Sequence, residues 1–175
     1  MNNKVLHQIN YGMYIVCSKR GEELNGQVVN TAVQITSEPA TLVVSINKQN
    51  LTHEFIQESK AFSISILQEE TPMTFIGRFG FKSGRNINKF EGINFKIGST
   101  DVPLVLDNAV SYLECNVINS VDVGTHTIFI GSIVNAEIIQ EGNPMTYDYY
   151  HKVKKGSAPQ TAPTYIKKQI EIEAK

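Results

Sequence analysis

The sequence has no tryptophan, only two cysteines and no long apolar run. Cys17 and Cys115 each lie inside an apolar stretch and show neither a CxxC pair nor metal-like spacing, so we expect buried, unpaired thiols in a reducing compartment. The first residues lack a basic stretch followed by an apolar one, and nowhere do about 18 apolar residues follow one another. These absences predict a cytoplasmic protein that is not associated with a membrane.

An excess of charge of one sign is also lacking. The 175 residues carry 16 Lys and Arg against 17 Asp and Glu, which gives a formal net charge of -1. A chain without a strong overall field is not expected to bind nucleic acid, so any basic site must be local. The length fits one domain with a core of its own.

Several catalytic and cofactor motifs are absent from the chain. No GxGxxG follows a strand, no GxxxxGK[ST] occurs, and no GxSxG is present. These absences argue against a dedicated dinucleotide fold, a P-loop NTPase and an α/β-hydrolase. His53 and His151 show no ligand spacing to a cysteine or an acidic cluster, so no metal site is expected.

Runs rich in Val, Ile, Thr and aromatic residues are what the chain does contain, bounded by Gly, Asn, Pro and Ser. Two segments with helical spacing interrupt them, one after Asn50 and one after Pro72. No alternating βαβ rhythm occurs, so the fold is expected to be mainly β and antiparallel. The predicted strands are 11–18, 27–36, 41–47, 61–67, 93–98, 109–121 and 126–140.

The stretch from Tyr147 onward changes character, because Pro159 and Pro163 lie in a basic segment of small residues. We expect it to be extended, either as a disordered terminus or as an arm that docks on the body or on a second subunit. Its tyrosines favour docking, since they bring apolar area that a disordered tail rarely carries.

The most informative local feature is the junction between a strand and a helix at residues 45–53. A helix N-terminus attracts phosphate, and Lys48, Asn50 and Thr52 add a cation and side-chain donors. The alternative is an ordinary capped helix with a solvated lysine, and the residues alone do not decide between the two.

Polar side chains also interrupt an otherwise apolar strand at Asn30, Thr31 and Gln34. Buried polar groups need partners, so these residues either bind the amide edge of a flat ligand or face water from a half-exposed strand. The loop 77–90, rich in glycine and basic residues, suits closure over an anion or is a solvated connection. His126 follows a predicted turn in an apolar strand, where a lone histidine is usually structural.

Taken together, these segments resemble the flavin reductase-like, FMN-binding split-barrel family, in particular its flavoredoxin and rubredoxin-linked branch. The similarity begins in NGQVVNTAVQITSEPATLVVSINKQNLTHEFIQESK and continues through NKFEG, GTHTIFIGSIVNAE and YYHKVKKGSAPQTAPTY. It implies a mainly β fold, an FMN-binding split β-barrel of Greek-key type with two or three short inserted helices. Residues 1–150 would form this domain, and residues 151–175 an extended C-terminal arm on the barrel or the partner subunit.

The resemblance also implies roles for individual residues. His126 matches a histidine near the flavin, and Tyr165 is a candidate aromatic cover for the ring, although the tryptophan that some relatives use is absent. Lys89 would lie near the phosphate or the ribityl chain. The strand residues implied for the isoalloxazine are Asn30, Thr31, Ala32, Val33 and Gln34, and those implied for the phosphate are Asn47, Lys48 and Thr52.

The function implied is that of a homodimeric oxidoreductase in which FMN takes electrons from NADH, NADPH or a reduced iron protein. The acceptor would be free flavin, a ferric complex or a rubredoxin-type protein, and the flavin would carry the redox chemistry. A flavin-binding electron carrier without nicotinamide activity is the alternative. A split-barrel relative that binds haem or another planar ligand is a third possibility.

Overall fold

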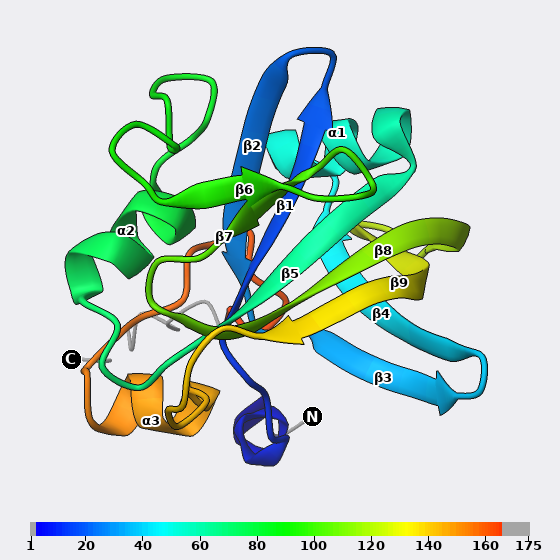
Figure 1. The fold of residues 1–175 in the computed structure, drawn as a ribbon. Helices are drawn as coiled ribbons and strands as arrows, with labels where there is room; N and C mark the ends of the chain where they lie inside the picture. Colours follow the sequence, from blue (N-terminus) through cyan, green and yellow to red (C-terminus); the bar gives the residue numbers. More distant parts are fainter. Residues whose placement is uncertain (1–2, 166–175) are drawn as a thin grey trace, which may run out of the picture.

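The computed structural model of the chain describes residues 3–165, and it consists mainly of antiparallel strands (Figure 1). The strands are β1 Tyr14–Arg20, β2 Glu23–Val29, β3 Ala32–Ser37, β4 Ala40–Asn47, β5 Ala61–Leu67, β6 Phe95–Ile97, β7 Pro103–Val105, β8 Ala109–Asp122 and β9 His126–Ile138. The helices are the 3-10 helix η1 Asn3–Gln8 and the α-helices α1 Leu51–Ser59, α2 Met73–Phe81 and α3 Tyr147–Lys152. The mainly β prediction is therefore confirmed.

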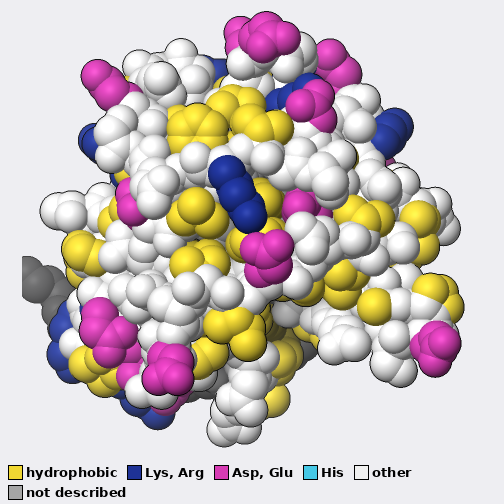
Figure 2. Space-filling model, in the orientation of Figure 1, with side chains coloured by type: hydrophobic (Ala, Val, Ile, Leu, Met, Phe, Trp, Pro, Cys, Tyr) yellow, Lys and Arg dark blue, Asp and Glu magenta, His cyan; other side chains and the backbone are white. Residues whose placement is uncertain are grey.

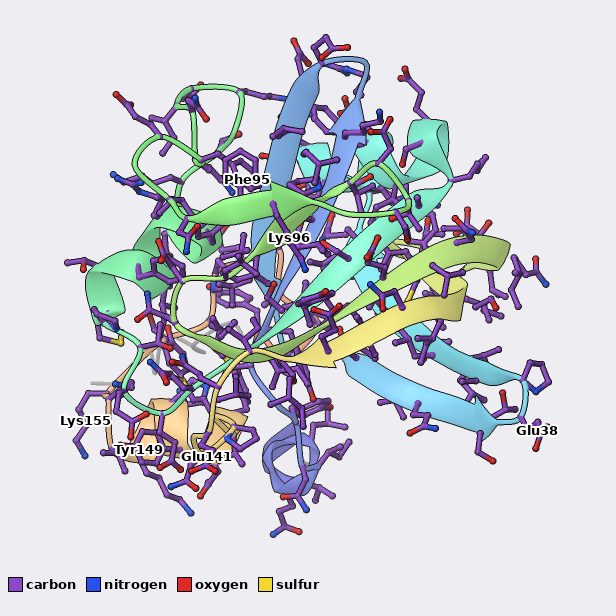
Figure 3. The ribbon with its side chains drawn as sticks, viewed as in Figure 1. Glu38, Phe95, Lys96, Glu141, Tyr149 and Lys155 are labelled. Carbon is purple, nitrogen blue, oxygen red and sulfur yellow. The ribbon has the colours of Figure 1, made fainter. Side chains whose placement is uncertain are left out.

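Seven strands form one sheet in the order β2-β1-β5-β8-β9-β4-β3, and every pairing is antiparallel. The pair β6-β7 forms a separate small sheet, which crosses in front of β1 and β5 in Figure 1. The β3–β4 hairpin projects from one side of the molecule, while α2 and α3 lie on the other. The tip of this hairpin at Glu38 and the side chains of Tyr149 and Lys155 mark these opposite sides in Figure 3.

The prediction of a single strand over residues 27–36 is wrong. Within this segment the chain leaves one edge of the sheet and joins the opposite edge. β2 ends at Val29 and pairs with β1, whereas β3 begins at Ala32 and pairs with β4 at the opposite edge. Asn30 and Thr31 make the crossing, and the backbone N–H of Ser45 donates to the carbonyl oxygen of Thr31 (3.3 Å). Local strand propensity cannot show this change of partner.

The long strands β8 and β9 form the predicted hairpin. Gly124 occupies the turn with a φ of 84°, a conformation that glycine adopts without strain. The N–H of Val123 donates to the carbonyl oxygen of His126 (3.0 Å), which closes the turn.

Two apolar clusters make up the core. One lies between α2, α3 and the start of β1 and contains Met13, Ile76, Phe79 and Tyr150, and the other lies inside the seven-stranded sheet around Phe62. Cys17 and Cys115 are free and fully buried, as predicted. Burial raises the pKa of each thiol to about 12, so both are unreactive structural residues.

Glu114 of β8 is a buried carboxylate that fixes the loop between β6 and β7. Its oxygens accept hydrogen bonds from the Oγ of Ser99 (3.2 Å), from the N–H (3.0 Å) and Oγ1 (3.1 Å) of Thr100, and from Nδ2 of Asn135 (2.9 Å). Burial alone raises the pKa of this carboxyl, but the hydrogen bonds outweigh it and lower the pKa below its ordinary value.

The prediction of an extended segment from Tyr147 onward is wrong for its first residues, because Tyr147–Lys152 forms the helix α3. Thr146 caps this helix, and its Oγ1 accepts a hydrogen bond from the N–H of Tyr149 (3.1 Å). The helix crosses the boundary expected between residues 150 and 151. Irregular chain follows to Tyr165 and packs on the body of the protein.

Candidate functional site

A cavity of about 300 Å³ lies between β2, the junction of β4 and α1, the end of α2, and α3. Residues 157–163, which we call the strap, form its remaining wall. Loop and terminal segments commonly complete sites that rigid strands position.

The polar end of the cavity lies at the N-terminus of α1. Asn50 is the N-cap residue but makes no side-chain capping bond, so the first N–H groups of the helix have no cap from it. Thr52 is buried there, and its Oγ1 accepts a hydrogen bond from Nδ2 of Asn25 (2.8 Å). Lys82 and Arg85 also line the cavity; Arg85 pairs with Glu54 and donates to the carbonyl oxygen of Gln49 (3.4 Å) beside this helix end, whose N–H groups favour an anion.

Three amide side chains from β2 and its end carry buried oxygens with no partner among the described residues. These are Oδ1 of Asn25, Oε1 of Gln27 and Oδ1 of Asn30, and all three residues line the cavity. A buried acceptor without a donor costs about 1–3 kcal/mol. A ligand with N–H or O–H groups along one edge would satisfy these oxygens.

Lys89 is a cation buried in the wall of the cavity, with 4% of its surface exposed. Its Nζ donates to the carbonyl oxygens of Gly26 (2.8 Å) and Phe79 (3.1 Å). Burial lowers the pKa of its ammonium from 10.5 to about 8, partly opposed by Cys17. An ammonium has three N–H donors, so one remains for a ligand.

The opposite end of the cavity is apolar and aromatic. Met13, Ile76, Phe79, Tyr147 and Tyr150 line it. The cavity therefore has one end for an anion and another for an apolar ring system, with amides between them.

The strap is held by side chains that also line the cavity. Nδ2 of Asn30 donates to Oγ1 of Thr164 (2.9 Å), and Nδ2 of Asn47 donates to the carbonyl oxygen of Thr161 (3.3 Å). The hydroxyl of Tyr150 donates to the carbonyl oxygen of Ser157 (2.9 Å). Asn30 thus contacts the residue that follows the strap with its amide nitrogen and leaves its amide oxygen for a ligand.

Comparison with protein-family models decides the classification. The model described as "Flavin reductase like domain" matches residues 6–156, which is most of the chain. The chain belongs to the flavin reductase-like family. It is therefore a flavin reductase-like oxidoreductase.

Two relatives of this flavin reductase-like protein are similar over nearly its whole length. A protein named high molecular weight rubredoxin from Moorella thermoacetica is 53% identical over 94% of this chain and 72% of the relative. A protein named ferric-chelate reductase (NAD(P)H) from Archaeoglobus fulgidus is 45% identical over 95% of this chain and 98% of the relative.

Solved structures share the fold. The NADH:FAD oxidoreductase of Streptomyces globisporus has a TM-score of 0.74 at 22% identity, covering 81% of this chain and 83% of its own. Flavoredoxin from Methanosarcina acetivorans has a TM-score of 0.69 at 21% identity, covering 77% and 74%. The split-barrel prediction is confirmed.

The residues that the sequence implied for the flavin divide into two groups. Asn30, Asn47, Thr52 and Lys89 line one cavity, although they come from distant parts of the chain. The others lie outside its lining, and their roles stay predictions. This second group is Thr31, Ala32, Val33, Gln34, Lys48, His126 and Tyr165.

Each residue of the second group has a definite place. Lys48 forms an ion pair with Asp122, and His126 donates from Nε2 to the carbonyl oxygen of Thr161 in the strap (3.3 Å). The residues 31–34 lead into the edge strand β3, where Val33 is 60% exposed. Tyr165 is 38% exposed at the end of the described chain.

Gln27, Phe79, Tyr150 and the strap line the cavity but were not among the implied residues. Gln27 lies two positions from Asn25 on β2, so period-two alternation could have placed both on one face. Nothing local in the sequence shows where the strap crosses the body.

Proposed function

We propose that the cavity binds FMN and that the protein passes electrons from NADH or NADPH through it to an acceptor. The unpaired oxygens of Asn25, Gln27 and Asn30 beside an anion-attracting helix end carry the proposal. FMN has a phosphate, a ribityl chain with hydroxyl donors and a flat ring with an N–H edge, which are the groups that such a cavity lacks. The names of the relatives, a rubredoxin and an NAD(P)H ferric-chelate reductase, support an iron-containing acceptor.

The protein groups bind and orient in this proposal, while bound FMN supplies the two-electron redox chemistry. The N-terminus of α1 and Thr52 hold the phosphate, and Lys89 adds a buried positive charge. The strap excludes water from one side of the cavity, which strengthens the electrostatic interactions inside it. No acid or base of the protein is required for a hydride to reach the ring.

We also propose that the active form is a homodimer. The face of β3, β4 and β9 that points away from the core carries an apolar row, in which Val33 pairs with Val43 and Val43 pairs with Ile130. Val33 is 60% exposed in this row and Val43 and Ile130 are half-buried, and such an apolar surface fits a second copy.

Anaerobic mixing with nicotinamide tests the function. The purified protein is expected to be yellow, and NADH or NADPH should bleach its flavin absorbance in a stopped-flow experiment. Retention of FMN without bleaching by either nucleotide would instead identify an electron carrier. A colourless protein that does not take up added FMN would contradict the flavin site itself.

Removing the strap should loosen the flavin. A chain ending after Ala158 loses the bonds that Asn30, Asn47 and His126 make to the strap and its following residue, so we expect the Kd for FMN to rise about 10-fold or more, as for one or two hydrogen bonds. A chain ending after Tyr165 keeps all these contacts and serves as the control. Equal FMN affinity of the two truncated chains, measured by fluorescence titration, would show that the strap has no role in retention.

A further inference from the structure

The segment from Thr71 to Phe90, which comprises α2 and the following loop, has an unusual charge pattern. It contains four basic residues and no acidic one, although the whole chain is nearly neutral. Lys89 is buried and Arg85 pairs with Glu54. Among residues 3–165, no acidic side chain pairs with Arg78 or Lys82; Arg78 donates to the carbonyl oxygen of Glu91 (2.6 Å), and Lys82 is exposed at the rim of the cavity.

The same segment exposes apolar side chains along one side of α2. Met73 is 39% exposed and Phe81 is 49% exposed, and residues 73, 77 and 81 lie on one stripe of the helix because they are four positions apart. Position 77 is a glycine with open space where a Cβ would stand. The stripe is therefore flat, and α2 lies at the side of the molecule without another element outside it (Figure 1).

This surface borders the cavity. Phe81 and Lys82 line the cavity, while Met73 and Arg78 lie further along the helix and do not. A protein that covers the stripe would therefore contact the rim of the proposed flavin site. Transfer of electrons between proteins requires the donor and acceptor groups to lie close together, and docking at this rim would place a carrier beside the cavity.

The basic residues of this surface show that it suits a different partner from the apolar row on β3, β4 and β9, which we proposed as the dimer interface. Two copies related by a two-fold axis would bring the same patch together, which places Arg78 and Lys82 opposite basic groups. An acidic partner meets the same groups with opposite charge. By contrast, basic, acidic and apolar side chains are interspersed on the face shown in Figure 2, so this face favours neither an acidic nor a basic partner.

We propose that the exposed side of α2, formed by Met73, Gly77 and Phe81 with Arg78 and Lys82, docks an acidic electron-carrier protein at the mouth of the cavity. This inference rests on the proposed function. NAD(P)H gives up two electrons, two oxidised one-electron carriers each take one, and the products are NAD(P)+, one proton and two reduced carriers. The carriers bind at α2 one after the other.

Binding of two small redox proteins of opposite charge tests the proposal. We choose an acidic rubredoxin and a basic cytochrome c as probes, with calorimetric titration of the FMN-loaded protein at low and at moderate salt. The acidic probe should bind, and its affinity should fall as salt rises; the basic probe should bind at least about 10-fold more weakly. Equal binding of the two probes would overturn the proposal.

Matched substitutions locate the surface. Met73→Glu places a negative charge on the stripe and should weaken rubredoxin binding about 10-fold or more, whereas Ile97→Glu adds the same charge to an exposed apolar position on β6 and should change it less than about twofold. Neither residue lines the cavity. Unchanged binding by Met73→Glu, or conversion of a dimer to a monomer by it in sedimentation, would overturn the proposal.

Reduction of a small ferric chelate by NAD(P)H separates this inference from the proposed function. Both variants should reduce the chelate at the wild-type rate, because the small acceptor needs no docking surface. Failure of chelate reduction with intact, charge-dependent rubredoxin binding would contradict the proposed function alone. Normal chelate reduction with no rubredoxin binding would contradict the docking surface alone.

Discussion

Lys89→Met should raise the Kd for FMN about 100-fold, as for loss of one charge-assisted hydrogen bond in a buried site. The ammonium is buried in the cavity wall and two of its donors are used by the carbonyl oxygens of Gly26 and Phe79. Its remaining donor and its charge are the interactions available to an anionic ligand. Fluorescence titration of the apoprotein with FMN measures the change.

The pH dependence of FMN binding gives a second measurement on the same group. Because burial lowers the pKa of Lys89 to about 8, the wild-type affinity for FMN should fall as pH rises above this value, and Lys89→Met should lose this dependence. The stability of the free protein has the opposite pH dependence: the contribution of Lys89 to the free energy of unfolding rises with pH. The unfolded chain holds the proton to about pH 10.5, so the contribution of Lys89 to the free energy of unfolding increases between pH 8 and 10.5.

Lys96→Met is the matched control, since this exposed lysine projects from β6 over the ring of Tyr112 and pairs with Glu137 (Figure 3). It should leave FMN affinity unchanged. A flat pH profile for the wild-type protein, or equal effects of the two substitutions, would remove Lys89 from the binding site.

Glu114→Ala should lower the free energy of unfolding by about 2–4 kcal/mol, because it removes the one buried acceptor that four part-buried hydrogen bonds share. Ser99, Thr100 and Asn135 all donate to this carboxylate. Denaturant unfolding at pH 7 measures the loss. Glu137→Gln, at an exposed ion pair, should cost less than about 1 kcal/mol.

Acid should reduce the difference between Glu114→Ala and the wild-type protein. The folded-state pKa of Glu114 lies below the value of 4.5 for the unfolded chain, so its stabilising contribution is complete above pH 4.5 and is lost as pH falls through the folded-state pKa. A difference that stays constant down to pH 2 would show that the charge does not contribute.

Much of the fold could be predicted from local sequence patterns. The β8–β9 hairpin and the helices α1 and α2 follow from strand propensity, a turn and helical periodicity within short segments. The separation of β2 from β3 could not, because residues 27–36 read as one strand and only their partners at opposite edges of the sheet divide them. Helix α3 was missed because it is short and lies next to a segment rich in proline.

The part of the site at the strand-to-helix junction could be predicted, because a helix N-terminus attracts an anion wherever it lies. The strand-to-helix junction indicated Asn47 and Thr52, and both line the cavity. Lys48 does not, since it lies in the turn after β4, where its side chain pairs with Asp122. The unpaired amide oxygens of Asn25 and Gln27 became visible only when burial and hydrogen bonds were known.

The position of the strap has a consequence for how the protein matures. Residues from β2 onward supply most of the cavity, but the wall formed by residues 157–163 is contributed more than a hundred positions later. Under the proposed function, a nascent chain on the ribosome is therefore expected to hold flavin in a closed site only after these residues have emerged and docked. We therefore expect cofactor loading to be a late step in the biogenesis of this oxidoreductase.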